Sequence, residues 1–582
     1  MSSSKARTKT KKKRKVIPTP EQLQKKAERD HRNGVESFLK KIGFKKIPTS
    51  NREINFEGRT GEIDAIFCHE NVIVVAEYTV GKSDNAHLLK KKILFDLILD
   101  NQSKFVRFCK MTYEGFESSI GNFYSDSQYK VNILYASKYE VSDEHKSACD
   151  RYRFIHGVRE KYFKALAKTI EMSARIEFLK FLGIRHEDYG ENAIGSQNNY
   201  SQYDGLLLPE ENSNYPQGYR IVSFYADAEG LMEKGYVLRR DSWREDSQHL
   251  YQRILIGKKI RNMRKYLKEE RRVFVNNIIV TLPAETELKD PDDITKSLNE
   301  NNVNKPQRVA IRIPSRFDMI GIIDGQHRIF CYHEGTDSAE SAISIRRKKQ
   351  NLLVTGIIYP KGIKVGERRR FEANLFLEIN DNQAKAKSSL KQDIEILIHP
   401  YSAIAISKRI VQGLGKKGPL KYLLQTGHFD GPELIKTTSI VSYGLRPLVK
   451  LDGDDSLFTV WNKEGKDKLK NASDDDHEEL LNSYIEHCVS HINNLLLAIK
   501  LSLNDPSQWQ KKTKKNNGML SPTTLNGFIV LLREIIRLKK SIPSTEKHRS
   551  RLVGLGKFQF ARYKSSRWKS LGEELFKQYY SD

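Results

Sequence analysis

Long apolar runs are absent from this 582-residue sequence. No stretch reaches the roughly 18 residues that a membrane-spanning helix needs, and the first 25 residues lack the apolar core of a signal peptide. Cysteine is scarce as well, and the five cysteines are widely spaced, without a Cys-x-x-Cys pair: Cys68, Cys109, Cys149, Cys331 and Cys488. Neither a disulfide framework nor a cysteine zinc site fits this pattern. We therefore expect a reducing compartment, the cytoplasm or, in a eukaryote, the nucleus.

Acidic residues are scarce at the two ends of the chain. Residues 1–48 hold 16 basic and 4 acidic side chains, and residues 505–582 hold 17 basic and 6 acidic ones. These ends contribute +23 of the formal net charge of +27, so the central 456 residues contribute only +4. Two basic arms on a near-neutral body predict a polyanionic partner, with nucleic acid first and an anionic membrane surface second. Our final expectation is DNA and no membrane.

The chain has enough apolar residues for several cores. Hydrophobic residues make up 38% of the sequence, with 25 Phe and 26 Tyr, which excludes wholesale disorder. At about 150 residues per domain, the length predicts three or four units of mixed α/β structure. We expect a disordered basic arm over 1–20, an α/β domain over 21–190, an α+β domain over 205–445 and a mostly helical basic region over 446–582. Residues 143–184 are expected to form one or two helices.

The basic arms offer candidate contacts to nucleic acid. Near the N-terminus these are Lys11, Lys12, Lys13, Arg14 and Lys15, which form either a nuclear import signal or a solvated tail that binds phosphates. Near the C-terminus they are Lys511, Lys512, Lys514, Lys515, Arg562, Lys564, Arg567 and Lys569. Tyr563 and Trp568 lie among the last four and could stack on unpaired bases. A solvated helix face with Trp568 and Phe576 in the core is the alternative.

Two apolar strands carry one carboxylate each. In GEIDAIFCHENVIVVAEYT, the pattern predicts strands over 63–68 and 72–79, joined by a tight turn at Glu70 and Asn71. Residues whose numbers sum to 141 then face each other, and Asp64 faces Glu77. Like charges opposed at about 5 Å in apolar surroundings are destabilising. A divalent cation held by both carboxylates would compensate, so the sequence predicts a metal site.

This pattern resembles the PD-(D/E)XK restriction-like nuclease family, in which a helix with a glutamate precedes a hairpin bearing Asp and then Glu-x-Lys. The resemblance implies catalytic roles for Glu36, Asp64 and Glu77, with Mg²⁺ or Mn²⁺ held by Asp64 and Glu77. Thr79 occupies the place of the family's lysine. Lys82 could supply that amine from the strand end, and Lys90, Lys91 or Lys92 could supply it from the following helix.

Three interpretations of the hairpin follow from this departure. The chain is an active nuclease with a displaced lysine, or a degenerate nuclease fold kept for DNA binding. In the third interpretation it is an unrelated hairpin with solvated acids. The sequence does not decide between them.

A second cluster of polar residues follows a buried strand in MIGIIDGQHRIFCYHEG. The strand is expected over 319–323, followed by a tight turn at Gly325 and a helix that begins near Gln326. Backbone N–H groups at the start of that helix, with His327 and Arg328 in its first turn, predict a phosphate site. Asp324 either caps the helix or helps to hold a metal.

Asp324, Gly325, Gln326, His327 and Arg328 match the signature of the DGQHR-domain family. That family resembles the ParB/sulfiredoxin fold and the DndB-like regulators of DNA phosphorothioation, which implies a nucleotide, ATP or CTP, at these five residues. Further matches are the Tyr251-Gln252-Arg253 segment and the residues Phe376, Ile379, Asn380 and Gln383. The string from Gly366 to Arg370, GERRR, also invites comparison with phosphate boxes. It lacks a preceding buried strand and leads straight into the helical pattern FEANLFLEIN, so we expect a solvated or DNA-facing basic turn there.

Taken together, the patterns predict a DNA-processing protein of a DNA-modification or anti-phage defence system. A metal-dependent deoxyribonuclease domain would be coupled to a ParB-like domain that either binds or also hydrolyses a nucleoside triphosphate. A non-catalytic DNA-binding regulator and an RNA-binding protein are the two alternatives.

Overall fold

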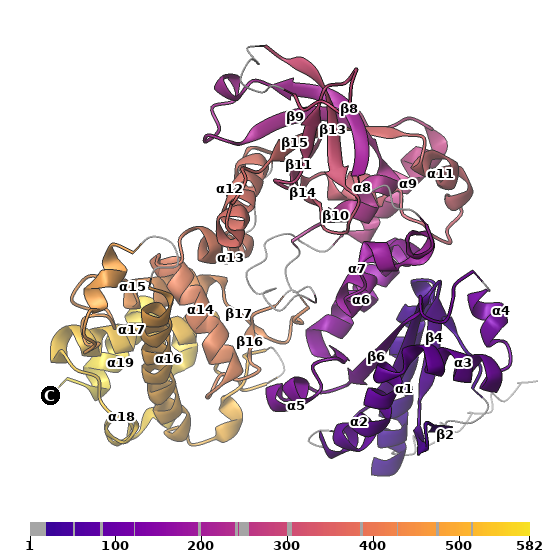
Figure 1. The fold of residues 1–582 in the computed structure, drawn as a ribbon. Coiled ribbons are helices and arrows are strands. Elements are labelled where there is room, and N and C mark those ends of the chain that lie inside the picture. Colours follow the sequence, from indigo (N-terminus) through magenta and orange to yellow (C-terminus); the bar gives the residue numbers. More distant parts are fainter. Residues whose placement is uncertain are drawn as a thin grey trace, which may run out of the picture. The chain divides into compact units, whose positions relative to one another are not determined.

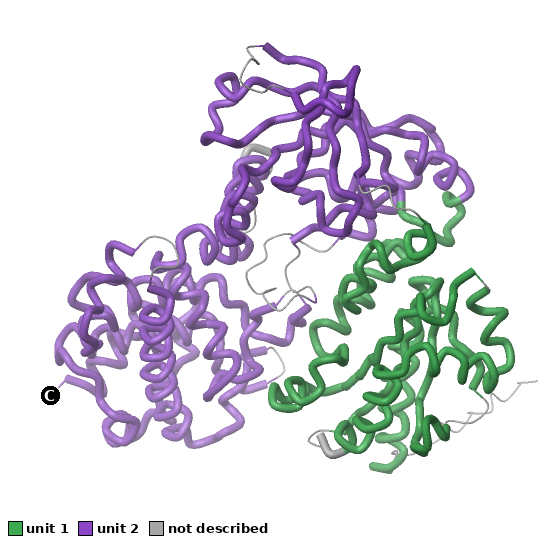
Figure 2. The backbone as a smooth tube through the Cα atoms, viewed as in Figure 1, with its two compact units in different colours: residues 1–197, 333–340 green, residues 198–332, 341–582 purple. Residues whose placement is uncertain are grey.

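The structure is a computed structural model. It describes residues 19–49, 53–81, 85–121, 123–195, 200–238, 243, 255–298, 305–383, 388–427, 429–472, 477–513 and 516–581. Several residues named above lie outside these ranges: Lys11, Lys12, Lys13, Arg14, Lys15, Lys82, Tyr251, Gln252, Arg253, Lys514 and Lys515. The chain divides into two compact units (Figure 2). Unit 1 comprises residues 1–197 and 333–340, and unit 2 comprises residues 198–332 and 341–582.

Unit 1 is built on a sheet in the order β1-β4-β5-β6-β7, in which β5 and β6 run parallel and β4 pairs antiparallel with β5 (Figure 1). Its strands are β1 Lys45–Lys46, β4 Ala65–His69, β5 Val72–Thr79, β6 Lys130–Ser137 and β7 Arg153–Ile155, with a separate hairpin of β2 Glu53–Phe56 and β3 Arg59–Glu62. Its helices are α1 Pro20–Lys41, α2 Asn85–Asp100, α3 Gln102–Thr112, α4 Phe116–Ile120, α5 Asp143–Ala148, α6 Gly157–Ile170 and α7 Ala174–Leu182.

The start and end of α1 follow from its sequence. Thr19 and Gln22 form a reciprocal capping box, and Pro20 occupies the first helical turn. Val35, Phe38 and Leu39 recur at helical spacing and are buried. The chain leaves the helix at Gly43, whose φ of +93° is one that glycine adopts without strain.

The hairpin of β4 and β5 has the predicted register. Ala65 pairs with Ala76 and His69 with Val72, so paired residue numbers sum to 141 as expected. Ten of the thirteen strand residues are buried, four of the five in β4 and the six residues Val72–Glu77 of β5, so neither strand exposes a polar face. The expectation of helices alone over 143–184 is wrong in one place, because Arg153–Ile155 forms β7 beside β6.

Unit 2 contains a larger sheet in the order β10-β14-β11-β15-β9-β8-β13-β12. The strand pairs β10–β14 and β11–β15 are parallel and the others antiparallel. The strands are β8 Tyr200–Leu208, β9 Arg220–Asp227, β10 Gly235–Tyr236, β11 Ile278–Leu282, β12 Glu287–Lys289, β13 Gln307–Pro314, β14 Ile320–Asp324 and β15 Asn351–Ile358. The accompanying helices are α8 Ala228–Lys234, α9 Gly257–Glu269, α10 Gln326–Phe330, α11 Glu340–Arg347, α12 Val365–Gln383 and α13 Ser388–Ile398.

The C-terminal part of unit 2 is mostly helical, as expected. It consists of α14 Ala403–Lys416, β16 Leu424–Gln425, β17 Ile435–Lys436, a π-helical turn Ile440–Leu445, α15 Arg446–Leu448, α16 Glu478–Leu501, α17 Pro522–Lys539, α18 Thr545–Arg551 and α19 Trp568–Tyr579. A core of Leu, Ile, Val and aromatic side chains joins these helices. Gly527 and Gly572 let α17 and α19 approach closely, because a Cβ at either glycine would lie 2.5 Å from a side-chain atom of the other helix.

Two further observations concern membrane-spanning helices and cysteine pairing. The described part of the chain contains no helix with the length and apolar composition that crossing a bilayer requires. All five cysteines are buried free thiols. Burial raises the pKa of each of them above its usual value, as at Cys68, where the pKa reaches about 12.

Candidate functional site

Asp64 and Glu77 converge at the carboxyl end of β5. Asp64 immediately precedes β4, and its Oδ2 accepts a hydrogen bond of 2.9 Å from the backbone N–H of Tyr78. Glu77 lies on β5 and is 2% exposed. Both side chains line one cavity of about 240 Å³. The proximity expected from the register is therefore present in the structure.

Helix α2 places two cationic or ionisable side chains on Glu77. Lys91 Nζ lies 3.3 Å from Glu77 Oε1, and His87 Nε2 lies 3.2 Å from the same oxygen. The two residues are four apart, so they share one face of the helix. Lys91 also donates a 2.8 Å hydrogen bond to the backbone carbonyl of Glu62, which fixes its amine. Of Lys90, Lys91 and Lys92, the candidate lysines within the described residues, Lys91 is the one that pairs with Glu77.

The electrostatics of Glu77 show the expected conflict. Burial raises the pKa of Glu77, and the neighbouring Asp64 raises it further, whereas His87 and Lys91 lower it. The second oxygen, Oε2, is buried and accepts no hydrogen bond within the described residues. A buried carboxylate oxygen without a partner is costly unless a donor or a cation meets it. This oxygen is the part of the site that a metal ion would satisfy.

The cavity is completed by α1 and by the end of β5. Glu28 and Arg32 of α1 line it, together with Glu62 and the segment 78–81. Arg32 lies over the ring of Tyr78 at 5.8 Å, and its Nε is buried without a hydrogen-bond acceptor in the described chain. An arginine so placed can bind a phosphate oxygen. Charges of both signs thus meet in one small cavity.

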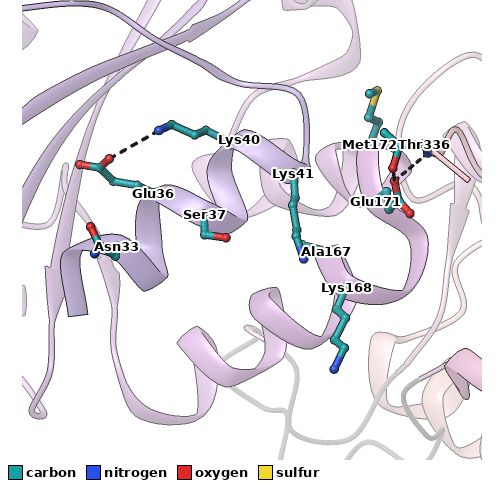
Figure 3. A pocket seen from close by; sticks show the side chains of 10 residues that line it. All are labelled: Asn33, Glu36, Ser37, Lys40, Lys41, Ala167, Lys168, Glu171, Met172 and Thr336. Carbon is teal, nitrogen blue, oxygen red and sulfur yellow. Dashed lines mark hydrogen bonds and ion pairs between the residues drawn. The ribbon is translucent and has the colours of Figure 1, made fainter. Parts of the chain in front are cut away.

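Glu36 lies elsewhere than the resemblance implied. Its carboxylate is 2.7 Å from Lys46 Nζ and 3.8 Å from Lys40 Nζ. It lines a different cavity of about 650 Å³, which also receives Lys40, Lys41 and Lys168, as Figure 3 shows. The acid of α1 that lines the cavity of Asp64 and Glu77 is Glu28. Lys82, the other expected catalytic residue, lies outside the described residues.

The donor set suits a hard cation with few protein ligands. Among the described residues, no group of three or more His, Cys, Asp and Glu side chains is arranged to hold a metal. Mg²⁺ keeps several waters and is commonly bound through one or two carboxylates plus substrate phosphates. Asp64 and the unpartnered Oε2 of Glu77 provide such a pair. A site of three histidines or cysteines of the zinc type does not fit these residues.

Sequence reasoning did not single out His87, Glu28 or Arg32. Each lies on a helix whose rotation about its axis is set by packing, so the sequence gives no direct signal for its direction. The four-residue spacing of His87 and Lys91 is the signal that could have paired them.

The Asp324–Arg328 box has the predicted strand, tight turn and helix, and the side chains of Asp324, His327 and Arg328 have partners within the protein. β14 ends at Asp324, Gly325 has a φ of +98°, and α10 begins at Gln326. Arg328 pairs with the carboxylate of Asp324, four residues before it. His327 Nε2 accepts a 3.1 Å hydrogen bond from the backbone N–H of Ile256. These contacts explain part of the polar cluster as local structure, and nucleotide binding by the box stays a prediction.

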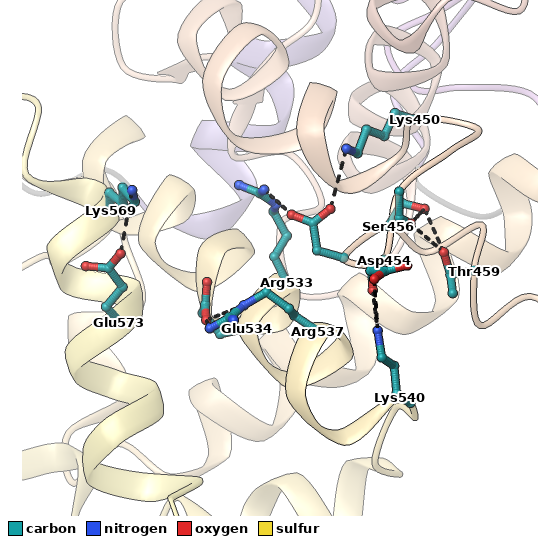
Figure 4. A network of polar contacts seen from close by, with 12 residues as sticks. Lys450, Asp454, Ser456, Thr459, Arg533, Glu534, Arg537, Lys540, Lys569 and Glu573 are labelled. Atoms are coloured by element: carbon teal, nitrogen blue, oxygen red, sulfur yellow. Dashed lines mark hydrogen bonds and ion pairs between the residues drawn. The ribbon is translucent and has the colours of Figure 1, made fainter.

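The C-terminal basic residues differ in how they are compensated. Arg562, Lys564 and Arg567 are exposed, and no ion-pair partner of theirs is found in the described part of the chain, whereas Lys569 lies 3.8 Å from Glu573. Figure 4 shows that other cations of this region pair with acids: Arg533 with Asp455, Arg537 with Glu534 and Lys540 with Asp454. Lys511 donates to the backbone carbonyls of Pro432 and Leu434, while Lys512 is exposed. Trp568 is half-buried and stacks on Tyr443 at 6.2 Å.

Comparison with protein-family models, with curated proteins and with solved structures finds no match to this chain. The arguments about its activity therefore depend on its own residues.

Proposed function

We propose that unit 1 is a metal-dependent DNA endonuclease domain, in a protein that serves a DNA-modification or anti-phage defence system. The observation that carries this proposal is the meeting of Asp64, Glu77 and Lys91 in one cavity at the end of β5. Two carboxylates and one amine are the groups that a PD-(D/E)XK site requires. The restriction-like fold itself, the ParB-like fold of residues 205–445 and the coupling between them belong to the same proposal.

Each residue of the cavity has a defined task in this proposal. Asp64, oriented by the N–H of Tyr78, and Oε2 of Glu77 would hold Mg²⁺ or Mn²⁺. When bound, such a cation supplies an acidified water and neutralises charge on the phosphate. Arg32 would bind a nonbridging oxygen of the DNA strand, because its Nε lacks an acceptor in the described chain.

Lys91 would take the part of the lysine that Thr79 replaces. Its amine is held between Glu77 Oε1 and the carbonyl of Glu62 and is 15% exposed. From this position it can orient the attacking water and stabilise negative charge at the phosphorus. The displaced lysine is the feature that favours an active enzyme over a degenerate fold.

DNA is the expected substrate because the chain carries exposed cations that lack acidic partners in the described residues. Arg562, Lys564 and Arg567 form one such group, and Lys41 and Lys168 in unit 1 form another. Each phosphate that they neutralise would release counterions, so binding should weaken steeply with salt.

The test is cleavage of supercoiled plasmid by the full chain with Mg²⁺ or Mn²⁺. We expect nicking or linearisation that Asp64→Ala, Glu77→Ala and Lys91→Ala each reduce by at least about 100-fold, since each removes a group that acts in the transition state. Lys90→Ala is the matched control, because Lys90 is an exposed neighbour on the same helix outside the cavity. Cleavage that is unchanged by all three substitutions would refute the assignment of the site.

A non-catalytic DNA-binding regulator is the second candidate. It is favoured by Thr79 in place of the lysine and by the engagement of Glu77 Oε1 with two side chains at once. This candidate predicts salt-sensitive duplex binding that survives Asp64→Ala and Glu77→Ala, without cleavage under any metal. Competition between duplex DNA and single-stranded RNA in the same binding assay tests the RNA-binding alternative.

A further inference from the structure

A cavity of about 450 Å³ opens where two parallel strands of unit 2 end. β11 and β15 pair in parallel, with Leu282 beside Ile358, and the residues that follow both strands line the cavity. In open parallel α/β sheets, ligands bind in crevices at the carboxyl ends of the strands, and this parallel pair within a mostly antiparallel sheet offers the same arrangement. The volume lies in the range of small-molecule sites. Asp324 of the Asp324–Arg328 box pairs with Ile279 near the start of β11, so the cavity and the box lie at opposite ends of this strand.

A buried carboxylate, that of Glu372, binds the hydroxyl group of Tyr359, one of the residues that line this cavity. Glu372 of α12 is 1% exposed, and its Oε1 accepts hydrogen bonds from Tyr236 at 2.5 Å, Tyr359 at 2.7 Å and Thr281 at 2.9 Å. Gly321 makes this possible, because a Cβ there would lie 2.2 Å from Thr281 Oγ1 and 2.6 Å from the hydroxyl of Tyr236. Gly321, the first glycine of MIGIIDG, is therefore explained by the hydroxyl groups of Thr281 and Tyr236, which occupy the space that a side chain would need.

Arg368 connects that cluster to the cavity. Its guanidinium lies 6.0 Å from the ring centroid of Tyr236, and Arg368 lines the cavity beside Tyr359 and Lys361. Glu372 Oε1 accepts its three hydrogen bonds from hydroxyl groups, and no ion pair between Glu372 and Arg368 is found in the described residues. Its Nε is buried and has no acceptor there. Such an arginine is positioned and still able to bind an anion.

The remaining lining gives the ligand its character. Lys361 adds a second positive charge, and Glu285 is the acid of the lining. Pro283, Ala284, Ile363 and Val365 add apolar surface. The cavity thus offers two cations for an acidic group and an apolar wall for an organic part. The GERRR string was expected to be a solvated or DNA-facing basic turn without a preceding buried strand. It instead lies in the first turns of α12, it follows the buried strand β15, and Arg368 is half-buried, so the expectation of a turn is wrong.

We propose that this cavity binds a phosphorylated small molecule, with Arg368 and Lys361 on its phosphoryl group and the apolar wall against its organic part. The site is independent of the nuclease proposal, because it lies in unit 2 and uses none of the residues of unit 1. It is also distinct from the Asp324–Arg328 box.

Calorimetric titration of the full chain with inorganic phosphate, ATP and CTP, without DNA, tests the proposal. We expect a nucleotide to bind more tightly than free phosphate, and Arg368→Gln to weaken that binding by at least about 10-fold, as for the loss of a charge-assisted bidentate contact. Lys364→Gln is the matched control, since it removes an exposed positive charge just before α12 that does not line the cavity, and should change the affinity by less than about 2-fold. Arg328→Gln should leave the affinity unchanged.

A second variant separates ligand binding from damage to the fold. Glu285→Gln removes the acid that repels an anion, and we expect it to tighten phosphate-ligand binding by about 2- to 5-fold, which a destabilised fold would not do. Equal affinities for the wild-type and Arg368→Gln proteins would overturn the proposal. So would loss of binding in Arg328→Gln alone, which would assign the ligand to the box, or the absence of binding by all three compounds at millimolar concentration.

Discussion

Replacing Asp64 by Asn should stabilise the protein in the absence of metal. Asp64 directly precedes the Ala65–Ala76 pair of the hairpin and lines the same cavity as Glu77, so we take the separation of about 5 Å that is typical of cross-strand neighbours. Two like charges at that distance repel each other by about 3 kcal/mol at an effective dielectric constant of 20. Because His87 and Lys91 offset part of the charge on Glu77, we expect a gain of about 1–2 kcal/mol in the free energy of unfolding. Asn can still accept the hydrogen bond from the N–H of Tyr78.

The assay is differential scanning calorimetry of the full chain with EDTA and with excess Mg²⁺. For a unit of roughly 200 residues, the expected gain corresponds to an increase of about 2–8 °C in the Tm of Asp64→Asn with EDTA. Mg²⁺ at 100 times its Kd should stabilise the wild-type protein by about 2.7 kcal/mol and the variant by far less. Asp100→Asn is the control, because Asp100 is an exposed partner of Arg151 and should leave the metal response intact.

Two results would refute this reasoning. A lower Tm of Asp64→Asn in EDTA would mean that the carboxylates do not repel each other. An equal response to Mg²⁺ in the variant and the wild type would mean that the cation binds elsewhere.

Three further predictions concern other parts of the chain. Burial, and to a smaller extent His491, lowers the pKa of His548 from 6.5 to about 4. Between these two pH values the folded protein therefore binds fewer protons than the unfolded one. The free energy of unfolding should fall by up to about 3 kcal/mol as the pH drops from 6.5 to 4. Urea unfolding should show a smaller loss in His548→Gln, and an equal loss would contradict the assignment. Lys408→Met should lower the free energy of unfolding by about 3–5 kcal/mol in the same assay, because it leaves the 1% exposed Asp393 without the amine that lies 3.0 Å away. The double variant Asp393→Leu with Lys408→Met should recover most of this loss. A cost below about 1 kcal/mol for the single variant would show that the pair is unimportant. Arg567→Gln should lower the slope of log K against log salt for duplex DNA by about 0.9. Arg537→Gln should change this slope less, because Arg537 already pairs with Glu534. If the Arg567→Gln and wild-type proteins have equal slopes, Arg567 does not contact the DNA.

The convergence of Asp64 and Glu77 could be predicted because it depends on local rules. A two-residue turn fixes the register of a hairpin, and a register fixes which residues face each other. The choice among Lys90, Lys91 and Lys92 could not be predicted, because successive helical residues point about 100° apart and only packing decides which one faces the sheet. That Glu28 rather than Glu36 lines the cavity of Asp64 and Glu77 could not be predicted either, because packing sets the rotation of α1 about its axis.

The cavity lined by Arg368 and Lys361 could not be predicted, for a different reason. The GERRR string was judged by its immediate neighbours, whereas Arg368 lies over the ring of Tyr236 of β10 and lines the cavity beside Tyr359, which follows β15. The Asp324–Arg328 box showed the opposite effect. Its polar residues lie together in the sequence, but Arg328 and His327 form contacts within unit 2 that the sequence does not reveal.

Anomalous diffraction from crystals of the full chain soaked with Mn²⁺ tests the central claim most directly. We expect a single strong peak in unit 1, about 2.0–2.3 Å from a carboxylate oxygen of Asp64 and from Oε2 of Glu77, with Lys91 still beside Oε1. A peak at other residues, or no peak at saturating Mn²⁺ with the two carboxylates in place, would contradict the claim that Asp64 and Glu77 form a metal site.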